Sequence, residues 1–404
     1  MRELSDWLNS YLDYTDGTES PTSYHTWCAV SAIAGALQRK VFLQWGLAET
    51  LYPNFYVVLI GTSGRTRKGT AIGIAKAMLK DLPGVTVVPE SSSGRQAMIV
   101  AMKRANKNFE DPTDGQIKFH CSVTAFSEEL SVFLGQGDIA YLASLTDWYD
   151  AKDDWEYETV SRGKDSLQGV CLNLCGGTAP DWIQSMLPQE ALGGGFTSRV
   201  IFVVEEHKRK IVPEYTVDDA TKELGRKLRM DLERINQLSG EMTFDEEGKK
   251  AYVDWYIDQD TKLSNGQPAI QDTRFAGYCE RRATHLRKLM MICSASRGDD
   301  LKLTKKDFTK AIGMLTAVEV NMSKTFGGLG KSRTSDSTET VMGYIKAVGY
   351  TTRQQILSRF YRDVDPKTLG IIEQPLPQTG VLTIILIPNA KGGPDKSYEW
   401  IGGQ

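Results

Sequence analysis

The stretch from Phe55 to Ala75 constrains this chain more than any other part of the sequence. It begins with the apolar run FYVVLI, continues with GTSGRTRKGT and ends in the small, apolar residues AIGIA. A buried strand, a Gly-rich loop and a helix in direct succession form the context that a phosphate-binding loop requires. In such a loop, backbone N–H groups and the positive end of the helix dipole face the phosphate oxygens. We therefore expect ATP and Mg²⁺ to bind at residues Gly61–Thr70, which we call the glycine loop.

The polar residues of the glycine loop have expected roles. Lys68 supplies positive charge to the β- and γ-phosphates, and either Thr70 or Ser63 approaches Mg²⁺. The residues expected at the nucleotide are Gly61, Ser63, Gly64, Arg67, Lys68, Gly69 and Thr70.

The glycine loop departs from the usual pattern G-x-x-x-x-G-K-[ST]. Seven positions separate Gly61 from Lys68, which is one more than the pattern has. Arg67 stands where a Gly is usual, and Gly69 stands where Ser or Thr is usual. The alternative interpretation is a surface turn rich in Gly and Arg, which the flanking strand and helix disfavour.

Apolar runs alternate with helical patterns between residues 55 and 205. Strands alternating with helices predict an α/β fold with a parallel sheet and helices on both faces. Such sheets bind ligands at the carboxyl ends of their strands, where the glycine loop falls. The expected strands are 55–60, 85–90, 118–126, 169–175 and 200–205, and the expected helices are 67–80 and 96–105.

Changes of pattern divide the chain into five segments. Residues 1–50 are expected to be a helical segment, residues 51–212 the P-loop ATPase core, and residues 213–325 a helical lid. The Gly/Ser-rich residues 326–337 are expected to be a linker. Residues 338–404, with three expected helices followed by a two-stranded wing, predict a winged-helix domain.

Composition limits the possible partners and location. The net charge is −3, so any contact with DNA depends on local basic patches. The sequence has no apolar run of roughly 18 residues and no signal-peptide pattern at its start, so we expect a cytoplasmic protein without a membrane helix. Cys171 and Cys175 have no second pair and no nearby His, so the six cysteines predict a reduced protein rather than a zinc site.

A second signal for nucleotide chemistry is the strand CSVTAFSEEL, which ends in Glu128 and Glu129. An ATPase needs one acid to hold Mg²⁺ through water and another to polarise the attacking water. The pair is either Ser127 with Glu128 or Glu128 with Glu129, and we favour Glu128 at the metal and Glu129 at the water. The alternative is a solvated helix N-terminus, where acids favour the helix dipole.

A third signal is the buried strand within GVCLNLCGGTAPDWI, which carries a single polar residue, Asn173. Burying an amide costs free energy unless it is hydrogen-bonded. We therefore expect Asn173 to contact the γ-phosphate or the attacking water, with Thr178 as the second candidate. The alternative is that Asn173 only caps the end of its strand.

A fourth signal is Arg199, which follows the triple Gly of GGGFTSRVIFVVEE at the mouth of a strand. An Arg at this place can reach the γ-phosphate of a neighbouring subunit and stabilise charge during phosphoryl transfer. The alternative is an Arg paired with a surface carboxylate of its own subunit.

Four segments in the same order resemble an uncharacterised family of phage- and plasmid-encoded primase–helicase proteins. They are FYVVLIGTSGRTRKGTA, VTAFSEEL, LNLCGGTAPDW and GFTSRVIFV, and the resemblance covers about residues 20–320. It implies a P-loop ATPase with a ring-forming helicase core. The segment SRVIFV is also similar to the arginine-finger segment of minichromosome maintenance helicases. The implied roles are Lys68 as phosphate ligand, Glu128 or Glu129 as Walker B acids, Asn173 as sensor 1 and Arg199 as arginine finger.

The same resemblance implies a sensor 2 Arg on a helical lid. Arg281 or Arg282, in GYCERRATHLRKLMMI, stands where such proteins have it, and Arg282 is counted with the nucleotide-binding residues. The alternative is a solvated basic helix face. Residues 1–50 contain no zinc motif and no acidic primase motif, so primase activity is not expected.

Two regions are candidates for binding DNA. Residues 152–168 predict a hairpin with Arg162 and Lys164 at its tip, although four acids share it and an ordinary solvated hairpin is the alternative. Phosphate contacts need Lys and Arg rather than a fixed sequence. In the expected winged helix the candidates are Arg353 and Arg359, and contact with protein instead of DNA is the alternative.

The sequence therefore predicts an ATP-dependent DNA helicase of phage or plasmid replication. It is expected to form a ring, a hexamer, that moves on single-stranded DNA, with a separate primase or polymerase as a further partner. One alternative is an ATP-driven initiator or helicase loader without unwinding activity. Another is a winged-helix module that binds DNA or protein and has a degenerate nucleotide site.

Overall fold

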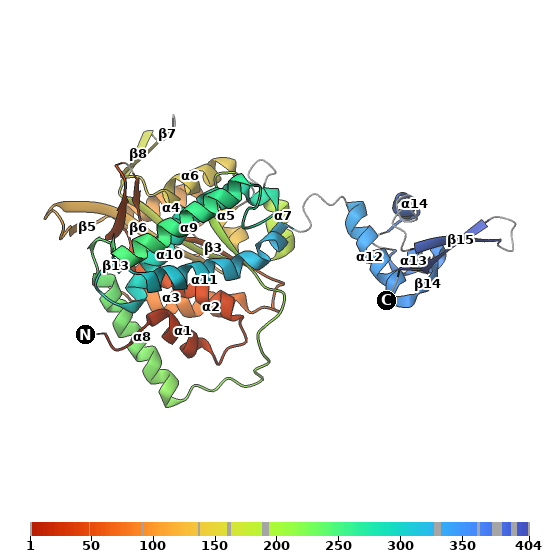
Figure 1. Cartoon of the computed structure of the whole chain (residues 1–404), viewed down its shortest axis with the longest axis horizontal. Coiled ribbons are helices and arrows are strands. Elements are labelled where there is room, and N and C mark those ends of the chain that lie inside the picture. The colour runs from red at the N-terminus through yellow and green to blue at the C-terminus, as the bar shows by residue number, and fades with distance from the viewer. Residues whose placement is uncertain are drawn as a thin grey trace. The chain divides into compact units, whose positions relative to one another are not determined.

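The computed structural model describes residues 2–47, 49–90, 92–135, 138–159, 163–187, 194–326, 333–361, 364–373, 382–388 and 394–402. The chain forms two compact units, Met1–Phe326 and Gly327–Gln404 (Figure 1). The boundary falls beside the expected linker, and the three segments expected before it all belong to the first unit. None of the helices in the described part of the chain combines the length and apolar composition needed to span a lipid bilayer.

The first unit is built on a central parallel sheet. Five strands pair in parallel in the order β10, β3, β9, β6, β4, and β5 pairs antiparallel with β6. The expectation of an α/β fold with a parallel sheet is thereby confirmed. The strands are β3 (Tyr56–Ile60), β4 (Val87–Val88), β5 (Lys107–Glu110), β6 (Ile117–Ser127), β9 (Val170–Thr178) and β10 (Val200–Val204).

Two edge strands differ from the expectation. The strand expected at residues 85–90 is only two residues long, because it follows a turn at Gly84 with φ 73° and ends before Pro89, which has no N–H for the ladder. The short edge strand β5 was not expected, because its sequence KNFE is not apolar; half of its residues are exposed.

Helices cover both faces of the sheet, as a buried parallel sheet requires. Asn173 and Cys175 of β9 face α2, since their side chains contact Ser31 and Cys28. On the opposite face, the Tyr56 hydroxyl donates to the carbonyl of Leu145 in α6. The helices of this region are α2 (Thr22–Leu37), α3 (Lys68–Lys80), α4 (Gly94–Arg104), α5 (Leu130–Leu134), α6 (Ile139–Tyr149) and α7 (Pro180–Met186), with the 3₁₀ turn η2 (Thr197–Arg199) before β10.

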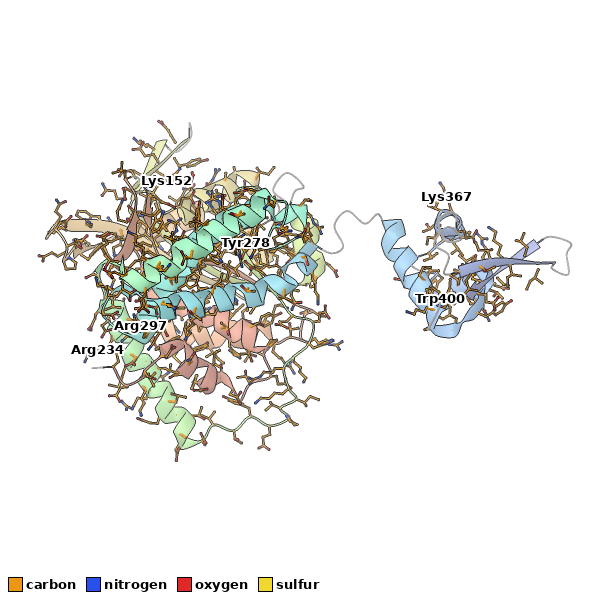
Figure 2. All side chains as sticks on the ribbon, in the orientation of Figure 1. Lys152, Arg234, Tyr278, Arg297, Lys367 and Trp400 are labelled. Carbon is orange, nitrogen blue, oxygen red and sulfur yellow. The ribbon has the colours of Figure 1, made fainter. Side chains whose placement is uncertain are left out.

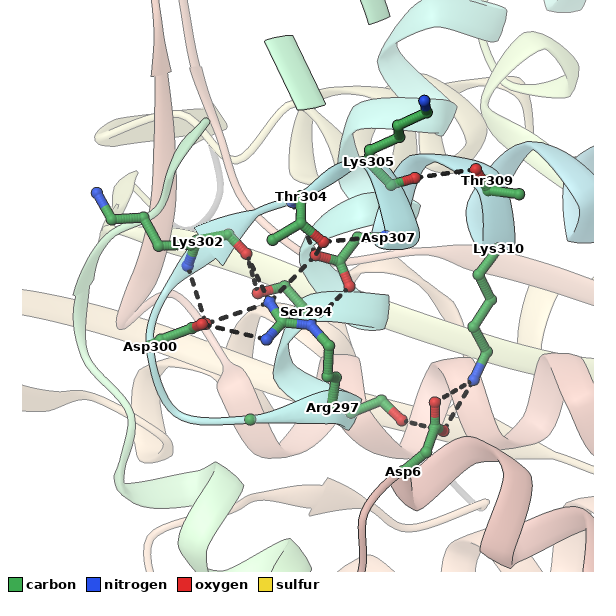
Figure 3. A network of polar contacts seen from close by, with 12 residues as sticks. Asp6, Ser294, Arg297, Asp300, Lys302, Thr304, Lys305, Asp307, Thr309 and Lys310 are labelled. Atoms are coloured by element: carbon green, nitrogen blue, oxygen red, sulfur yellow. Dashed lines mark hydrogen bonds and ion pairs between the residues drawn. The ribbon is translucent and has the colours of Figure 1, made fainter. Parts of the chain in front are cut away.

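The stretch from residue 215 to 325 is mainly helical, as expected, and it packs on the N-terminal helix. The Lys310 ammonium of α11 binds both carboxylate oxygens of Asp6, the N-cap of α1, and Arg297 of α10 binds Asp300 and Asp307 (Figure 3). The elements are α1 (Trp7–Thr15), α8 (Asp219–Gln237), α9 (Glu246–Ser264), η3 (Thr273–Phe275), α10 (Ala276–Arg297), α11 (Lys305–Met322) and η4 (Ser323–Phe326), with short strands β11 (Gly240–Glu241), β12 (Thr243–Phe244) and β13 (Lys302–Leu303).

Two hairpins accompany the sheet. The hairpin of β1 (Val41–Trp45) and β2 (Glu49–Leu51) pairs with β11. The hairpin expected at 152–168 consists of β7 (Asp154–Thr159) and β8 (Gly163–Gln168), and it stands out from the body of the first unit (Figure 1).

The described residues of the second unit form three helices and a small antiparallel sheet in the order β14, β16, β15. Its core contains Ile345, Leu369 and Tyr398, and Figure 2 shows Lys367 on α14 and Trp400 on β16. The elements are α12 (Arg333–Val348), β14 (Tyr350–Thr352), α13 (Arg353–Arg359), α14 (Pro366–Glu373), β15 (Leu382–Pro388) and β16 (Pro394–Trp400).

Candidate functional site

The carboxyl ends of three neighbouring strands bring the glycine loop together with the two acids. Ile60, the last residue of β3, pairs with Thr178 of β9, and Ser127, the last residue of β6, pairs with Gly176. The chain therefore leaves β3 and β6 at the same edge of the sheet, as the carboxyl ends of parallel strands must. Among the candidates, the structure unites Gly61, Ser63, Gly64, Arg67, Lys68, Gly69, Thr70, Glu128 and Glu129 at this edge.

Lys68 is the first residue of α3 and lies half-buried at the base of the glycine loop. Its ammonium group donates to the carbonyl oxygen of Gly61 over 2.5 Å. Burial lowers the pKa of Lys68, and the charge of Glu129 opposes this shift. The glycine loop thus folds back around the Lys68 ammonium, which is the group expected to meet phosphate.

Arg67 adopts a backbone conformation that is unusual for a residue with a side chain. With φ 54° and ψ 38° it lies in the left-handed region, which costs a non-Gly residue about 1–2 kcal/mol. The usual pattern has Gly at this position, and Gly adopts this conformation without strain. Two contacts hold Arg67 in place: its Nε donates to Glu19 over 2.7 Å, and its carbonyl accepts from the Ser20 hydroxyl over 2.7 Å.

Gly69, at the place of the usual Ser or Thr, lies against the Glu128 side chain. A Cβ built on Gly69 would be 2.7 Å from Oε2 of Glu128, so the exposed Glu128 carboxylate would have to shift to admit a side chain there. The two hydroxyls expected near Mg²⁺, Thr70 and Ser63, are both exposed, and Gly64 forms the turn between them with φ 70°. The choice between Thr70 and Ser63 stays open.

Glu128 and Glu129 follow the fully buried end of β6, and both side chains are exposed. In the described part of the chain, neither carboxylate accepts a hydrogen bond or forms a salt bridge. Glu129 is the N-cap of α5, but its side chain makes no capping hydrogen bond. Glu128 is the acid beside Gly69, and the charge of Glu129 acts on Lys68; the assignment of Glu128 to the metal and Glu129 to the water stays a prediction.

The residues present fit a magnesium–nucleotide complex. No three His, Cys, Asp or Glu side chains converge on one point in the residues that the structure describes. Mg²⁺ at nucleotide sites is bound by one or two carboxylates together with phosphate oxygens, so such a cluster is not required. Glu128, an exposed carboxylate beside the start of α3, supplies the ligand type that Mg²⁺ prefers.

The structure does not bring Asn173 to the glycine loop. Asn173 lies five residues before Thr178 along β9, which is roughly 16 Å at the rise of a strand. Its amide oxygen accepts from the Phe55 N–H over 3.1 Å, and its amide nitrogen donates to Ser31 over 2.9 Å. The buried amide thus uses both its oxygen and its nitrogen in hydrogen bonds to Phe55 and Ser31. Thr178, whose carbonyl accepts from the Gly61 N–H, is the polar residue of β9 at the site.

Arg199 also lies away from the glycine loop of its own subunit, at the amino end of β10. Its guanidinium forms a two-point ion pair with Asp150, over 2.9 and 2.5 Å, and donates to the Gly195 carbonyl over 2.6 Å. Only 6% of its side chain is exposed. This geometry corresponds to the alternative in which Arg199 pairs with a carboxylate of its own subunit, because a finger for a neighbour must be exposed.

Arg282 is bound inside the helical part of the first unit. Its guanidinium donates to both carboxylate oxygens of Glu319 in α11, over 2.7 and 2.8 Å, and to Gln259 in α9. None of its hydrogen bonds reaches the glycine loop. The other sensor 2 candidate, Arg281, lies 3.8 Å from Asp150 on the same side as Arg199.

The candidates for DNA contact are mostly engaged within the chain. Lys164 pairs with Glu156 over 2.6 Å, but an exposed pair of this kind contributes only about 0–1 kcal/mol, so Lys164 stays a prediction. Arg162 lies outside the described residues. Arg353 donates to the buried carboxylate of Glu373, and the Arg359 guanidinium lies 4.9 Å from the ring centre of Tyr344.

The N-terminal segment contributes residues to the site that sequence reasoning missed. Glu19 and Ser20 bind Arg67, and the Tyr24 hydroxyl donates to the Ile60 carbonyl over 2.6 Å, just before the glycine loop. These residues stand in the polar stretch DGTESPTSY, about 40 positions before the loop in the chain, and no spacing in the sequence connects them to it.

The search of known protein families gave no model that matches this sequence. No curated protein is similar enough to be identified as a relative. The resemblance to phage and plasmid primase–helicase proteins therefore stays a prediction, and the candidate site depends on its own geometry.

Proposed function

We propose that this chain binds ATP with Mg²⁺ at the glycine loop and hydrolyses it. The observation that carries this proposal is the meeting of a half-buried Lys68 at a helix N-terminus with two exposed carboxylates at the carboxyl edge of a parallel sheet. Both carboxylates are exposed and have no protein partner among the described residues, so a ligand can reach them.

Each group has one task in this proposal. Lys68 and the first N–H groups of α3 bind the β- and γ-phosphate oxygens, where positive charge stabilises the transferring phosphoryl group. When bound, Mg²⁺ would supply positive charge that offsets the negative charge developing on the phosphate oxygens. Glu128 holds the water shell of the metal, and Glu129 orients the attacking water and accepts its proton.

The broader role that we propose is an ATP-driven motor on single-stranded DNA in phage- or plasmid-type replication. Its support is the resemblance of the four segments, together with the hairpin β7–β8, which projects from the first unit (Figure 1). The second unit, with three helices and a β15–β16 hairpin, is compatible with the expected winged helix. Residues 338–404 hold seven Lys and Arg against six Asp and Glu, so they give little electrostatic support for DNA binding.

Assembly as a ring rests on the resemblance alone, because Arg199 is bound to Asp150. An ATP-driven initiator or loader would use the same nucleotide site without unwinding DNA. A binding module with a degenerate site would bind nucleotide without turnover.

The deciding experiment measures ATP hydrolysis by purified full-length protein with and without single-stranded DNA, beside a sizing measurement. Turnover that depends on Mg²⁺ and Lys68 supports the ATPase, and stimulation by single-stranded DNA supports the motor. Unwinding of a forked duplex separates a helicase from an initiator or loader. Nucleotide binding without any turnover would instead support the degenerate site.

A further inference from the structure

The glycine loop is held from outside the sheet by one carboxylate, Glu19, in the segment between α1 and α2. Glu19 accepts from Arg67 Nε over 2.7 Å, from Lys208 Nζ over 2.5 Å and from the backbone N–H of Val212 over 3.1 Å. The adjacent Ser20 hydroxyl donates to the Arg67 carbonyl over 2.7 Å. Two consecutive residues thus bind both the side chain and the backbone of Arg67.

Arg67 needs such support because its left-handed conformation is strained for a residue with a Cβ. A loop binds phosphate only while its N–H groups converge on one point. If Arg67 relaxed into a right-handed or extended conformation, the peptide between Arg67 and Lys68 would rotate and its N–H would turn away. The Glu19 side chain is 15% exposed and the Arg67 side chain 48% exposed, so solvent partly screens their ion pair, and the hydrogen bond from Ser20 adds to the hold on Arg67.

We propose that Glu19 is a positioning residue of the glycine loop, which keeps Arg67 left-handed and thereby sets the affinity of the loop for nucleotide phosphates. The inference rests on the proposed function, because it assumes that ATP binds at this loop. Glu19 acts through Arg67 and does not itself touch the nucleotide. The N-terminal segment is then part of the nucleotide site.

The inference predicts a specific coupling between Glu19 and Arg67. Glu19→Gln keeps the size of the side chain but removes its charge, so the hold on Arg67 weakens. A glycine at position 67 adopts the left-handed conformation without strain. In the Arg67→Gly background, the loss of the Glu19 charge should therefore have little effect on the conformation of the loop or on ATP affinity. We expect Glu19→Gln to weaken ATP binding roughly tenfold in the wild-type chain, about the effect of one charge-assisted hydrogen bond, and less than about twofold in Arg67→Gly.

The test measures the dissociation constant of Mg–ATP by titration calorimetry for full-length wild type, both single variants and the double variant. Asp16→Asn is the matched control. Asp16 pairs with Arg209 and Lys210, which directly follow Lys208 in the chain, but none of its ion pairs involves Arg67. The control variant should leave ATP affinity unchanged. Equal effects of Glu19→Gln in both backgrounds, or no effect in either, would overturn the inference.

Two further variants keep the outcome decisive. Lys68→Ala separates the two proposals. If ATP binding does not depend on Lys68, the proposed function and this inference are both overturned. If ATP binding depends on Lys68 but is unaffected by Glu19→Gln, the inference alone is overturned. If thermal melting shows that Glu19→Gln does not fold, Ser20→Ala takes its place. That variant removes only the hydrogen bond to the Arg67 carbonyl, and it should weaken ATP binding in the wild-type chain but not in Arg67→Gly.

Discussion

Polar side chains at the two edges of the central sheet differ in their burial and in their hydrogen bonding. At the carboxyl edge, Glu128 and Glu129 are exposed and unpaired in the described structure, and Lys68 binds only a backbone carbonyl. At the amino edge, the buried Lys288 ammonium donates to the side chain and backbone of Asn54. His285, fully buried, bridges the Tyr149 hydroxyl and the Ser198 carbonyl over 3.1 and 3.0 Å.

This difference separates residues that build the protein from residues that are available for chemistry. Burial of a polar group costs free energy unless every donor and acceptor is satisfied, so the amino edge must be a closed network. Asn173 and Arg199 belong to that network, although their sequence contexts suggested catalytic roles. In the part of the chain that the structure describes, Glu128 and Glu129 at the carboxyl edge are charged groups that a ligand can engage without breaking a contact with the protein.

Replacing Lys68 is expected to give the largest effect on function. Lys68→Ala removes the cation that the proposal places at the β- and γ-phosphates, so turnover should fall on the order of 10³-fold or more, and ATP binding should weaken. Steady-state ATPase and titration calorimetry measure both effects. Lys76→Ala, on the exposed side of the same helix where Lys76 pairs with Glu90, should retain normal turnover. Normal turnover of Lys68→Ala would exclude the glycine loop as the site.

The two acids at the carboxyl edge should have separable effects. Glu129→Gln is expected to bind ATP normally and hydrolyse it about 10²–10³-fold more slowly, because it removes the base for the attacking water. Glu128→Gln should raise the Mg²⁺ concentration needed for binding and turnover. Titrations with Mg²⁺ at fixed ATP distinguish these outcomes, and Glu110→Gln, an exposed acid on β5, is the control. If the two phenotypes are exchanged, the assignment of Glu128 and Glu129 must be exchanged as well.

At the amino edge the expected loss is of stability. Arg199→Ala removes a buried ion pair and leaves Asp150, which is 37% exposed, to be rehydrated, so the free energy of unfolding should fall by about 2–3 kcal/mol. Arg226→Ala, which breaks an exposed pair with Glu223, should cost no more than about 1 kcal/mol. Urea unfolding of the full chain gives both values.

Mixing the Arg199→Ala and Lys68→Ala proteins tests whether Arg199 at the amino edge acts in a neighbouring subunit. If Arg199 acted as a finger in a neighbouring subunit, Arg199→Ala would be stable but inactive, and mixing it with Lys68→Ala protein would restore some ATPase. We expect instead a destabilised protein and no recovery on mixing. Recovery in mixed oligomers would show that the ion pair with Asp150 opens on assembly, and the amino edge would then belong to the active site.

A separate expected effect on stability is a pH dependence that originates from buried histidines. Burial lowers the pKa of His285 to about 3 and the pKa values of His25 and His120 to about 4, from about 6.5 in an unfolded chain. Below pH 6.5 these histidines therefore become protonated in the unfolded chain while they stay neutral in the native chain. Stability should fall as the pH drops from 6.5 towards 4, by about 1.4 kcal/mol per pH unit for each histidine.

Variants of single histidines measure this contribution. Between pH 6 and pH 4.5, His285→Gln should reduce the slope of unfolding free energy against pH by the contribution of one histidine, about 1.4 kcal/mol per pH unit. His207→Gln, which changes an exposed histidine, should leave the slope as it is in wild type. An unchanged slope in His285→Gln would mean that His285 takes up its proton in the native state.

The elements of the fold could be read from the sequence because their signals are local. The apolar run before the glycine loop and the periodic pattern after it predicted β3 and α3 within a residue or two. The same holds for the strands that became β6 and β10, whereas β9 runs three residues beyond its expected end. The order of the strands could not be read in this way, since β9 lies between β3 and β6 through pairings of residues far apart in the chain.

The sequence by itself determined that Lys68, Glu128 and Glu129 lie at the carboxyl ends of parallel strands, because chain direction and element boundaries are enough to place them there. Only the tertiary structure decided which polar residues are already satisfied. Arg199 meets a carboxylate 49 positions away, and Arg67 is held by Glu19, 48 positions away. Such partners are set by how the elements pack, and no spacing or composition reports them, so the same residue types were equally compatible with catalysis and with architecture until their partners were known.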